Sequence, residues 1–179
     1  MDVIAFTASE RKTPESKRDN GYIVPGTGDE EGSIPSAWYH GLDKKSLHNF
    51  LSQDIDILLI SVPLTKETRH FLGTEEFEIL SKKKALIINI SRGTIVKQDE
   101  LIEAVKSGKL GGAALDVTDP EPLPENSKLW DVENITVTPH ISGISVAYAE
   151  RSLEIFARNL ERLAKGEDLL NLVDREKGY

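Results

Sequence analysis

The chain of 179 residues carries 22 Lys and Arg against 30 Asp and Glu, for a formal charge of −8, and contains no cysteine. This acidic balance argues against nucleic acid and against anionic membrane surfaces as partners. The lack of cysteine excludes disulfides, thiolate metal sites and a cysteine nucleophile, and the absence of a secretory signal or a long apolar run favours a cytoplasmic protein.

Apolar runs bounded by turn residues alternate with helical patterns along the chain. The runs predict five strands, at Val3–Phe6, Ile55–Val62, Ala85–Ile90, Gly111–Val117 and Asn134–His140. Helices are predicted at 44–53, at 74–80 with Thr74 as N-cap, and at 99–107, and a longer one with a single apolar stripe is predicted from about Val146 to Gly166. The run Ala85–Ile90 has no polar face, so we expect it to be buried on both sides of a parallel sheet.

Residues 9–41 differ from the rest in composition. They are rich in proline, glycine and charge and have no periodicity, so they are interpreted as a long surface excursion. The glycines at Gly26, Gly28 and Gly32 look at first like a phosphate-binding loop. Their spacing is wrong by one residue, and the carboxylates between them would repel a pyrophosphate, so this interpretation is rejected.

The alternation of strands and helices predicts an open α/β sheet. Arg92 lies at the end of the third strand, Asp116 and Glu121 at the end of the fourth, and His140 at the end of the fifth. In an open parallel sheet, ligands bind at the carboxyl ends of the strands. A cation, an acid and an imidazole that converge there can bind a carboxylate, hold an imidazole protonated and deliver a proton, as the reduction of a 2-keto acid requires.

Each of these residues also has a structural interpretation. Arg92 could close a strand on the solvated rim, next to Gly93, where the missing Cβ makes room for a ligand or for a turned backbone. His140 could be a turn residue, Glu121 an exposed loop carboxylate between prolines, and Asp116 a helix or turn cap. The remaining histidines have no partners at ligand spacing and are interpreted as structural, and no metal is expected.

Taken together, three segments identify a family resemblance. Asn89–Gly93, Leu115–Pro124 and Thr138–Gly143 resemble, in order and spacing, the motifs of the D-isomer-specific 2-hydroxyacid dehydrogenases. The glyoxylate/hydroxypyruvate reductases and their fungal relatives look most similar. The segment Pro63–Thr68 also matches that family's loop after the fourth strand, and the resemblance extends from about residue 1 to residue 166.

The resemblance implies three catalytic residues. Arg92 would bind the carboxylate and carbonyl of the substrate. His140 would donate the proton in reduction and accept it in oxidation. Glu121 would hydrogen-bond His140, favour its protonated form and fix its ring.

The resemblance also implies NADP or NAD as cofactor. Asp116, Ser142 and Gly143 would lie near the nicotinamide amide, Ile90 would pack on the ring, and Pro63 would lie near the adenosine. These positions match the family's motifs one by one.

The end of the first strand bears on the choice between the two cofactors. The family usually presents an acid there to the ribose hydroxyls. Here Thr7 takes that place and is followed by Ser9 and Arg11, which suit a 2′-phosphate better. NADP(H) is therefore the preferred cofactor, although the negative charge of Glu10 would disfavour a 2′-phosphate.

The family pattern further predicts the domain organisation. Residues 1–145 would form an incomplete Rossmann-type nucleotide-binding domain, with a mostly parallel sheet that lacks its first strand and its G-x-G-x-x-G turn. Residues 146–179 would form a C-terminal helix and tail that return toward a substrate domain. Family members carry a preceding segment on the order of 100 residues, so we expect the truncated later part of a dehydrogenase.

The sequence thus supports two kinds of function. The first is an NAD(P)-dependent oxidoreductase that acts on the CH–OH group of a D-2-hydroxy acid, reducing glyoxylate or hydroxypyruvate, and that is impaired in this truncated chain. The second is a non-catalytic dinucleotide-binding or dimerisation module. A homodimer is expected, because vacant strand edges invite pairing.

Overall fold

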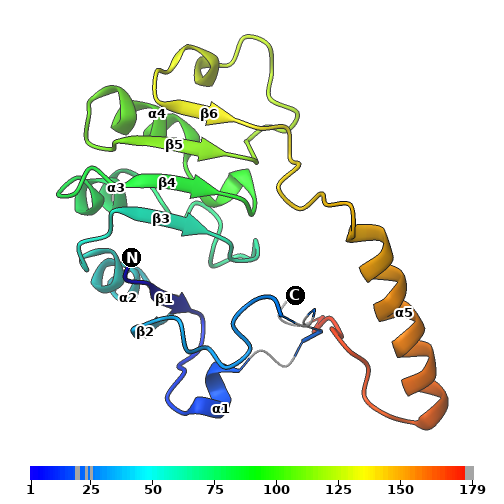
Figure 1. The fold of residues 1–179 in the computed structure, drawn as a ribbon. Helices are drawn as coiled ribbons and strands as arrows, with labels where there is room; N and C mark the ends of the chain where they lie inside the picture. Colours follow the sequence, from blue (N-terminus) through cyan, green and yellow to red (C-terminus); the bar gives the residue numbers. More distant parts are fainter. Residues whose placement is uncertain (19–20, 23, 25, 176–179) are drawn as a thin grey trace. The chain divides into compact units, whose positions relative to one another are not determined.

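The computed structural model describes residues 1–18, 21–22, 24 and 26–175. These residues divide into two compact units, one of Met1–Gly41 with Gly143–Tyr179 and the other of Leu42–Ser142. Figure 1 shows the elements of both. Residues 19–20, 23 and 25 of the expected excursion, and residues 176–179 of the expected tail, lie outside the described residues.

The unit Leu42–Ser142 is built on a parallel sheet, which confirms the predicted α/β class. Its strands are β3 (Ile57–Ile60), β4 (Leu86–Asn89), β5 (Gly112–Leu115) and β6 (Ile135–Val137), in the order β3-β4-β5-β6. Asn89 lies opposite Leu115, and Leu115 opposite Val137. The residues that follow these three strands therefore begin at one edge of the sheet.

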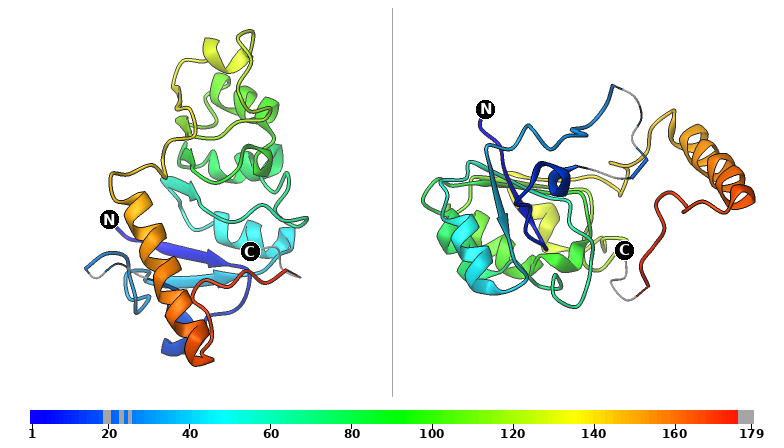
Figure 2. Two further views of the ribbon diagram at one scale, coloured as in Figure 1. Left: turned by 90° about the vertical axis from the view of Figure 1, so that its right-hand side faces the viewer. Right: turned by 90° about the horizontal axis from the view of Figure 1, so that it is seen from below.

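Three helices accompany this sheet: α2 (Lys44–Leu51), α3 (Thr74–Leu80) and α4 (Gln98–Lys106). Figure 2 shows α3 and α4 on one face of the sheet. The core lies between these layers, where Phe77, Ile87 and Leu101 are each at most 1% exposed. These apolar side chains recur at helical and strand periods, which explains why the sequence predicted the elements.

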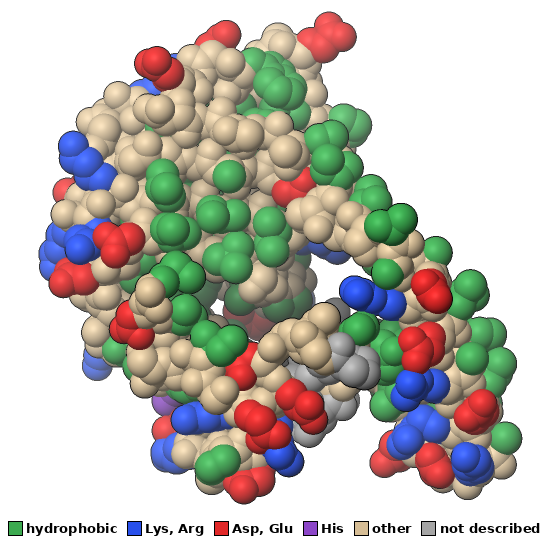
Figure 3. Space-filling view, viewed as in Figure 1, with side chains coloured by type: hydrophobic (Ala, Val, Ile, Leu, Met, Phe, Trp, Pro, Cys, Tyr) green, Lys and Arg blue, Asp and Glu red, His purple; other side chains and the backbone are tan. Residues whose placement is uncertain are grey.

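The other face of the sheet is apolar and exposed. Ile57 and Leu59 of β3 and Leu86 of β4 are 49%, 54% and 45% exposed, and Figure 3 shows hydrophobic side chains gathered over these strands. The expectation that Ala85–Ile90 is buried on both sides is therefore wrong. Among the described residues of this unit, the helices bury side chains on only one face of the sheet, so alternate strand residues remain exposed.

The start of α3 differs from the prediction. Thr74 is its first helical residue and Gly73 is the N-cap, so the assignment of Thr74 as N-cap was wrong. The backbone N–H of Gly73 donates to Glu76 Oε2 (2.9 Å), and Thr74 donates through its hydroxyl to Glu100 Oε2 (2.7 Å). Carboxylates from α3 and α4 therefore supply the acceptors that an N-cap side chain would otherwise provide.

In the other unit, β1 (Ile4–Thr7) pairs in parallel with β2 (Ala37–His40). The sequence predicted the first strand but not the second, which lies within the stretch 9–41 that was interpreted as an excursion. That stretch also contains the short helix α1 (Pro14–Lys17). Trp38 and Tyr39 favour a strand, but a run of four residues among prolines and glycines has too little pattern to be recognised.

Helix α5 (Tyr148–Lys165) ends at Gly166, as predicted, and this glycine adopts the left-handed conformation with φ 70°. Its apolar stripe is exposed, with Leu153 at 67%, Phe156 at 61% and Leu160 at 52%. No helix among the described residues has the length and apolar character needed to cross a membrane.

Candidate active site

Arg92 is set at the rim by the turn that ends β4. Asn89, only 1% exposed, donates through Nδ2 to the carbonyl of Arg92 (3.0 Å) and accepts from the backbone N–H of Ser91 (3.1 Å). The side chain of Arg92 is exposed, and its Nη1 donates to the Ser91 carbonyl at 2.6 Å. Asn89 was not singled out from the sequence, although one amide inside an apolar run was the signal.

Gly93 lets two loops of the rim meet. A Cβ placed at Gly93 would lie 2.0 Å from the carbonyl oxygen of Thr118. Of the two explanations that the sequence left open, the turned backbone is therefore the one observed. Only glycine permits this approach, so the turn after Arg92 lies directly against the loop that leads to Glu121.

Glu121 and His140 form the expected hydrogen bond. Glu121 Oε1 lies 2.6 Å from His140 Nδ1, and the two side chains are 37% and 46% exposed. The backbone of His140 has φ 53°, in the left-handed region. The structure thus brings together, at the carboxyl edge of one sheet, four residues that we call the strand-end cluster: Arg92, Asp116, Glu121 and His140.

Asp116 is the buried member of this cluster, with 5% of its surface exposed. Its carboxylate accepts from Thr138 Oγ1 (2.6 Å), from the N–H of Ile141 (2.9 Å) and from the N–H of Ser142 (2.9 Å). Burial acts to raise the pKa of Asp116, but the hydrogen bonds from Ser142, Thr138 and Ile141 outweigh it and hold the pKa far below the usual carboxyl range. Asp116 is therefore ionised at neutral pH.

The predicted cofactor residues of the same unit lie along the strand ends. Pro63 follows β3 and is exposed, and its carbonyl accepts from Thr68 Oγ1 at 2.7 Å. Ile90 follows β4 and is 42% exposed, next to the turn that carries Arg92. Ile90 thus offers an exposed apolar side chain at the carboxyl edge of the sheet.

The remaining predicted cofactor residues belong to the other unit. Thr7 ends β1 and donates through Oγ1 to the carbonyl of Ser9 at 2.8 Å, and Arg11 donates to the carbonyl of Ser16. Gly143 has open space where a Cβ would point. The Arg11 guanidinium is thus directed to α1, with its Nε buried, and the sequence offers no G-x-G-x-x-G turn for the pyrophosphate.

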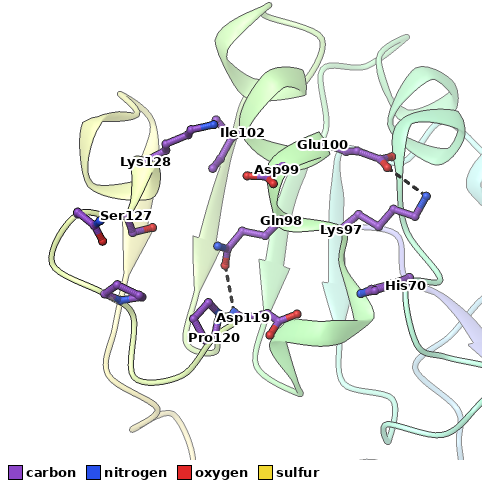
Figure 4. Close-up of a pocket in the computed structure, with 12 residues that line it drawn as sticks. His70, Lys97, Gln98, Asp99, Glu100, Ile102, Asp119, Pro120, Ser127 and Lys128 are labelled. Carbon is purple, nitrogen blue, oxygen red and sulfur yellow. Dashed lines mark hydrogen bonds and ion pairs between the residues drawn. The ribbon is translucent and has the colours of Figure 1, made fainter.

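A separate depression lies beside the N-terminus of α4. It has a volume of about 600 Å³ and is lined by residues that include His70, Lys97, Gln98 and Asp119 (Figure 4). Figure 4 shows Gln98 accepting from the N–H of Asp119, at 3.1 Å, and Lys97 paired with Glu100, at 3.0 Å. None of the three predicted catalytic residues lines it, so this depression is distinct from the strand-end cluster.

Comparison with known proteins agrees with the geometry. Residues 29–142 match the family described as "D-isomer specific 2-hydroxyacid dehydrogenase, NAD binding domain". A glyoxylate reductase of Thermofilum pendens is 39% identical over 155 residues, which are 87% of this chain and 44% of the relative. The chain thus spans less than half the length of this relative.

Two solved structures are similar in fold. A D-isomer specific 2-hydroxyacid dehydrogenase from Xanthobacter autotrophicus, in complex with NADPH and MES, is 37% identical with a TM-score of 0.71, and the match covers 80% of this chain and 57% of that one. An NADPH-dependent glyoxylate/hydroxypyruvate reductase from Sinorhizobium meliloti, in complex with NADP and sulfate, is 25% identical with a TM-score of 0.72, over 98% and 56% of the two chains.

Proposed function

The chain belongs to the family of D-isomer specific 2-hydroxyacid dehydrogenases, and on that premise we propose that it is an NAD(P)-dependent oxidoreductase acting on D-2-hydroxy acids. The favoured reaction is the reduction of a small 2-keto acid such as glyoxylate or hydroxypyruvate. The observation that carries the proposal is the 2.6 Å hydrogen bond between Glu121 and His140, at the same sheet edge as Arg92.

The chemistry of each residue follows from its position. A bound nicotinamide dinucleotide would supply the hydride. The exposed guanidinium of Arg92 would bind the substrate carboxylate and orient the carbonyl. His140 would give its proton to the carbonyl oxygen as the hydroxyl forms, and Glu121, on Nδ1, would orient the ring and leave Nε2 for the substrate.

NADP(H) is the cofactor that we favour. Arg11 and Ser9 follow β1, where a 2′-phosphate would be bound. Glu10, which would disfavour that phosphate, is paired with Lys12 at 2.9 Å. The similar structures in complex with NADPH and with NADP support the same choice.

The proposal includes three further points. The relatives are more than twice as long as the part that this chain matches, which supports lower activity for the chain alone than for a full-length relative. A homodimer and a cytoplasmic location are also part of the proposal. β3 and β6 are the end strands of their sheet, and such strands can pair with a second chain, which supports the homodimer. The absence of cysteine is compatible with the cytoplasm.

A second candidate function is a non-catalytic module that binds a dinucleotide or associates with another chain. The exposed apolar stripe of α5 favours it, because contiguous apolar surface of this kind marks interaction sites. Sedimentation and titration with NADPH would separate association from nucleotide binding.

The test of the catalytic proposal uses a matched pair of histidines. His140 and His70 both have positive φ, 53° and 52°, which Asn tolerates well. His140→Asn should lower the oxidation of NADPH by glyoxylate or hydroxypyruvate about 10²–10⁴-fold, the usual contribution of a general acid. His70→Asn, outside the cluster, should leave the rate unchanged.

The same assay can contradict the proposal. Full activity in His140→Asn would remove His140 from the chemistry. Absence of turnover in the unmutated chain with both keto acids and both dinucleotides would leave the non-catalytic module as the function.

A further inference from the structure

Resting on the proposed function, we infer that Gln98 is a positioning residue, which anchors the loop that presents Glu121 to His140. Gln98 is the first residue of α4 and lines the depression beside that helix, outside the strand-end cluster (Figure 4). It would act on the reaction through the loop that follows β5, without touching the substrate.

This loop has few N–H groups by which it can be anchored. Three of the six residues from Asp119 to Pro124 are prolines, which have no N–H. The N–H groups that remain belong to Asp119, Glu121 and Leu123. Within the described part of the chain, only the N–H of Asp119 donates a hydrogen bond, to Gln98 Oε1 at 3.1 Å. The side chain of Gln98 therefore supplies the acceptor for this stretch of backbone.

Glu121 lies between this anchor and a second one. At the far end of the loop, the carbonyl of Pro124 accepts from Trp130 Nε1 at 2.9 Å. At the near end, Asp119 is two residues before Glu121. The prolines on either side of Glu121 restrict φ at their own positions, so a displacement of the backbone at Asp119 is passed on to the glutamate.

Helix α4 gives this anchor a fixed base. Leu101 and Ile102, one turn after Gln98, are 0% and 2% exposed, so the start of the helix is held in the core. The backbone at Gly93 passes close to Thr118 and limits how near the loop can come. The hydrogen bond from the loop to Gln98 is attractive and holds the loop at that distance.

The pair of Glu121 and His140 depends on this backbone support. The two side chains are 37% and 46% exposed, so packing contributes little to their alignment. Their hydrogen bond of 2.6 Å is directional and weakens steeply when its geometry changes. Without the anchor at Asp119, the carboxylate of Glu121 would turn toward water, and the imidazole would lose the partner that orients it.

Amide exchange measured by NMR tests the anchor without cofactor or substrate. Gln98→Met keeps the length of the side chain and removes its amide oxygen. Exchange of the Asp119 amide should become about 2–10-fold faster, as the loss of one hydrogen bond predicts. Gln98→Glu keeps an acceptor oxygen and suits the first turn of a helix, so it should leave this exchange unchanged. The matched control Gln53→Met, at an exposed residue beyond the end of α2, should also leave it unchanged.

The NMR resonances of the His140 imidazole show whether the anchor acts on the strand-end cluster. In Glu121→Gln the ring loses its carboxylate partner, and its resonances define the unpaired state. Gln98→Met should move the His140 resonances toward those of Glu121→Gln. Gln98→Glu and Gln53→Met should leave them where they are in the unmutated chain.

Turnover adds a double-mutant cycle. Gln98→Met should lower kcat for the keto acid about 3–10-fold, a fraction of the contribution of a general acid, and leave the KM for NADPH unchanged. Gln98→Glu should keep the kcat of the unmutated chain. Because Gln98 acts through Glu121, Gln98→Met should change kcat less than about twofold when Glu121→Gln is already present.

Three results would overturn the inference. The first is unchanged exchange of the Asp119 amide in Gln98→Met. The second is faster exchange with unmoved His140 resonances, which would confine Gln98 to local structure. The third is an equal loss of kcat from Gln98→Met with and without Glu121. If the unmutated chain shows no turnover, the proposed function fails, while the NMR measurements still decide whether Gln98 aligns Glu121 with His140.

Discussion

Two buried carboxylates of the unit Leu42–Ser142, Asp116 and Glu76, accept hydrogen bonds from different kinds of donor. Asp116, 5% exposed, accepts from the hydroxyls of Thr138 and Ser142 and from backbone N–H groups. Glu76, 1% exposed, accepts from Lys44 Nζ (2.8 Å), His48 Nε2 (2.6 Å) and the N–H of Gly73 (2.9 Å). The charged partners of Glu76 are used in its own hydrogen bonds. At the strand-end cluster, in contrast, Arg92 and His140 are exposed and available for a ligand.

We call Lys44, His48 and Glu76 the helix cluster. Oxygen and nitrogen atoms of His48, Glu75 and Glu76 lie close enough together to surround a metal ion. However, Glu76 Oε1 already accepts from both Lys44 and His48, and an ammonium on a ligand atom opposes a second cation. The cluster joins α2 to α3, and these hydrogen bonds favour a structural role for it.

We expect the largest effect from a substitution that disrupts the sheet edge on which the strand-end cluster lies. Gly93→Ala would place a Cβ 2.0 Å from the Thr118 carbonyl oxygen and force the two loops apart. Because orientation of reacting groups is lost, we expect reductase activity to fall about 10²-fold, and we expect the free energy of unfolding to drop by about 1–3 kcal/mol.

Turnover with NADPH and unfolding in urea measure these two effects. For unfolding alone, Gly143→Ala is the control, because no atom lies within 4 Å of its added Cβ. Equal activities of Gly93→Ala and the unmutated chain would show that contact between the two loops is not required.

The next effect is on stability rather than on activity. Glu76→Gln leaves Lys44 and His48 without their anion. Loss of one partner of a buried pair costs about 3–5 kcal/mol, but Lys44 is half exposed, so we expect about 2 kcal/mol, because water replaces part of the lost interaction. Urea unfolding should show this loss, with kcat unchanged.

The exposed neighbour provides the control for this substitution. Glu75→Gln, on the same helix, should alter the unfolding free energy by no more than about 0.5 kcal/mol. A large loss of kcat in Glu76→Gln would contradict the separation of the two clusters.

Acid unfolding compares the two carboxylates directly. Burial raises the pKa of Glu76, but the hydrogen bonds from Lys44, His48 and Gly73 leave it below the usual range, and the pKa of Asp116 is also lowered. Because both pKa values are lower in the folded state, the unfolded chain binds protons first. The stabilisation is complete above about pH 4–5 and is lost as pH falls through the folded-state pKa values.

The unfolding free energy as a function of pH measures this contribution. Asp116→Asn and Glu76→Gln should each reduce its slope below pH 4–5, with about one fewer proton taken up on unfolding in each case. A slope equal to that of the unmutated chain would mean that the replaced carboxylate has the same pKa in both states.

We expect the smallest effect from the loss of a single hydrogen bond in the helix cluster. His48→Gln removes one of three donors to Glu76 and leaves Lys44 and Gly73 in place. We expect a loss of about 1 kcal/mol in the free energy of unfolding, the net value of a hydrogen bond. His40→Gln, at an exposed residue of β2, serves as the control and should show no loss.

Much of the fold could be predicted because periodicity is local. Four strands of one sheet, their helices and the glycine that ends α5 follow from residue spacing and turn chemistry. β2 was missed because four residues carry too little pattern. The exposed face of the sheet was also missed, because an apolar strand has the same sequence whether one face or both are covered.

The sequence by itself determined which chemical groups follow the parallel strands, because strand periodicity and motif order place Arg92, Glu121 and His140 at the same edge. Only the tertiary structure decided how that edge is held together: the approach of Gly93 to Thr118, and the carboxylate of Asp116 shared among Thr138, Ile141 and Ser142. These contacts join residues far apart in the chain, and their strength depends on distance and burial, which the order of residues does not contain.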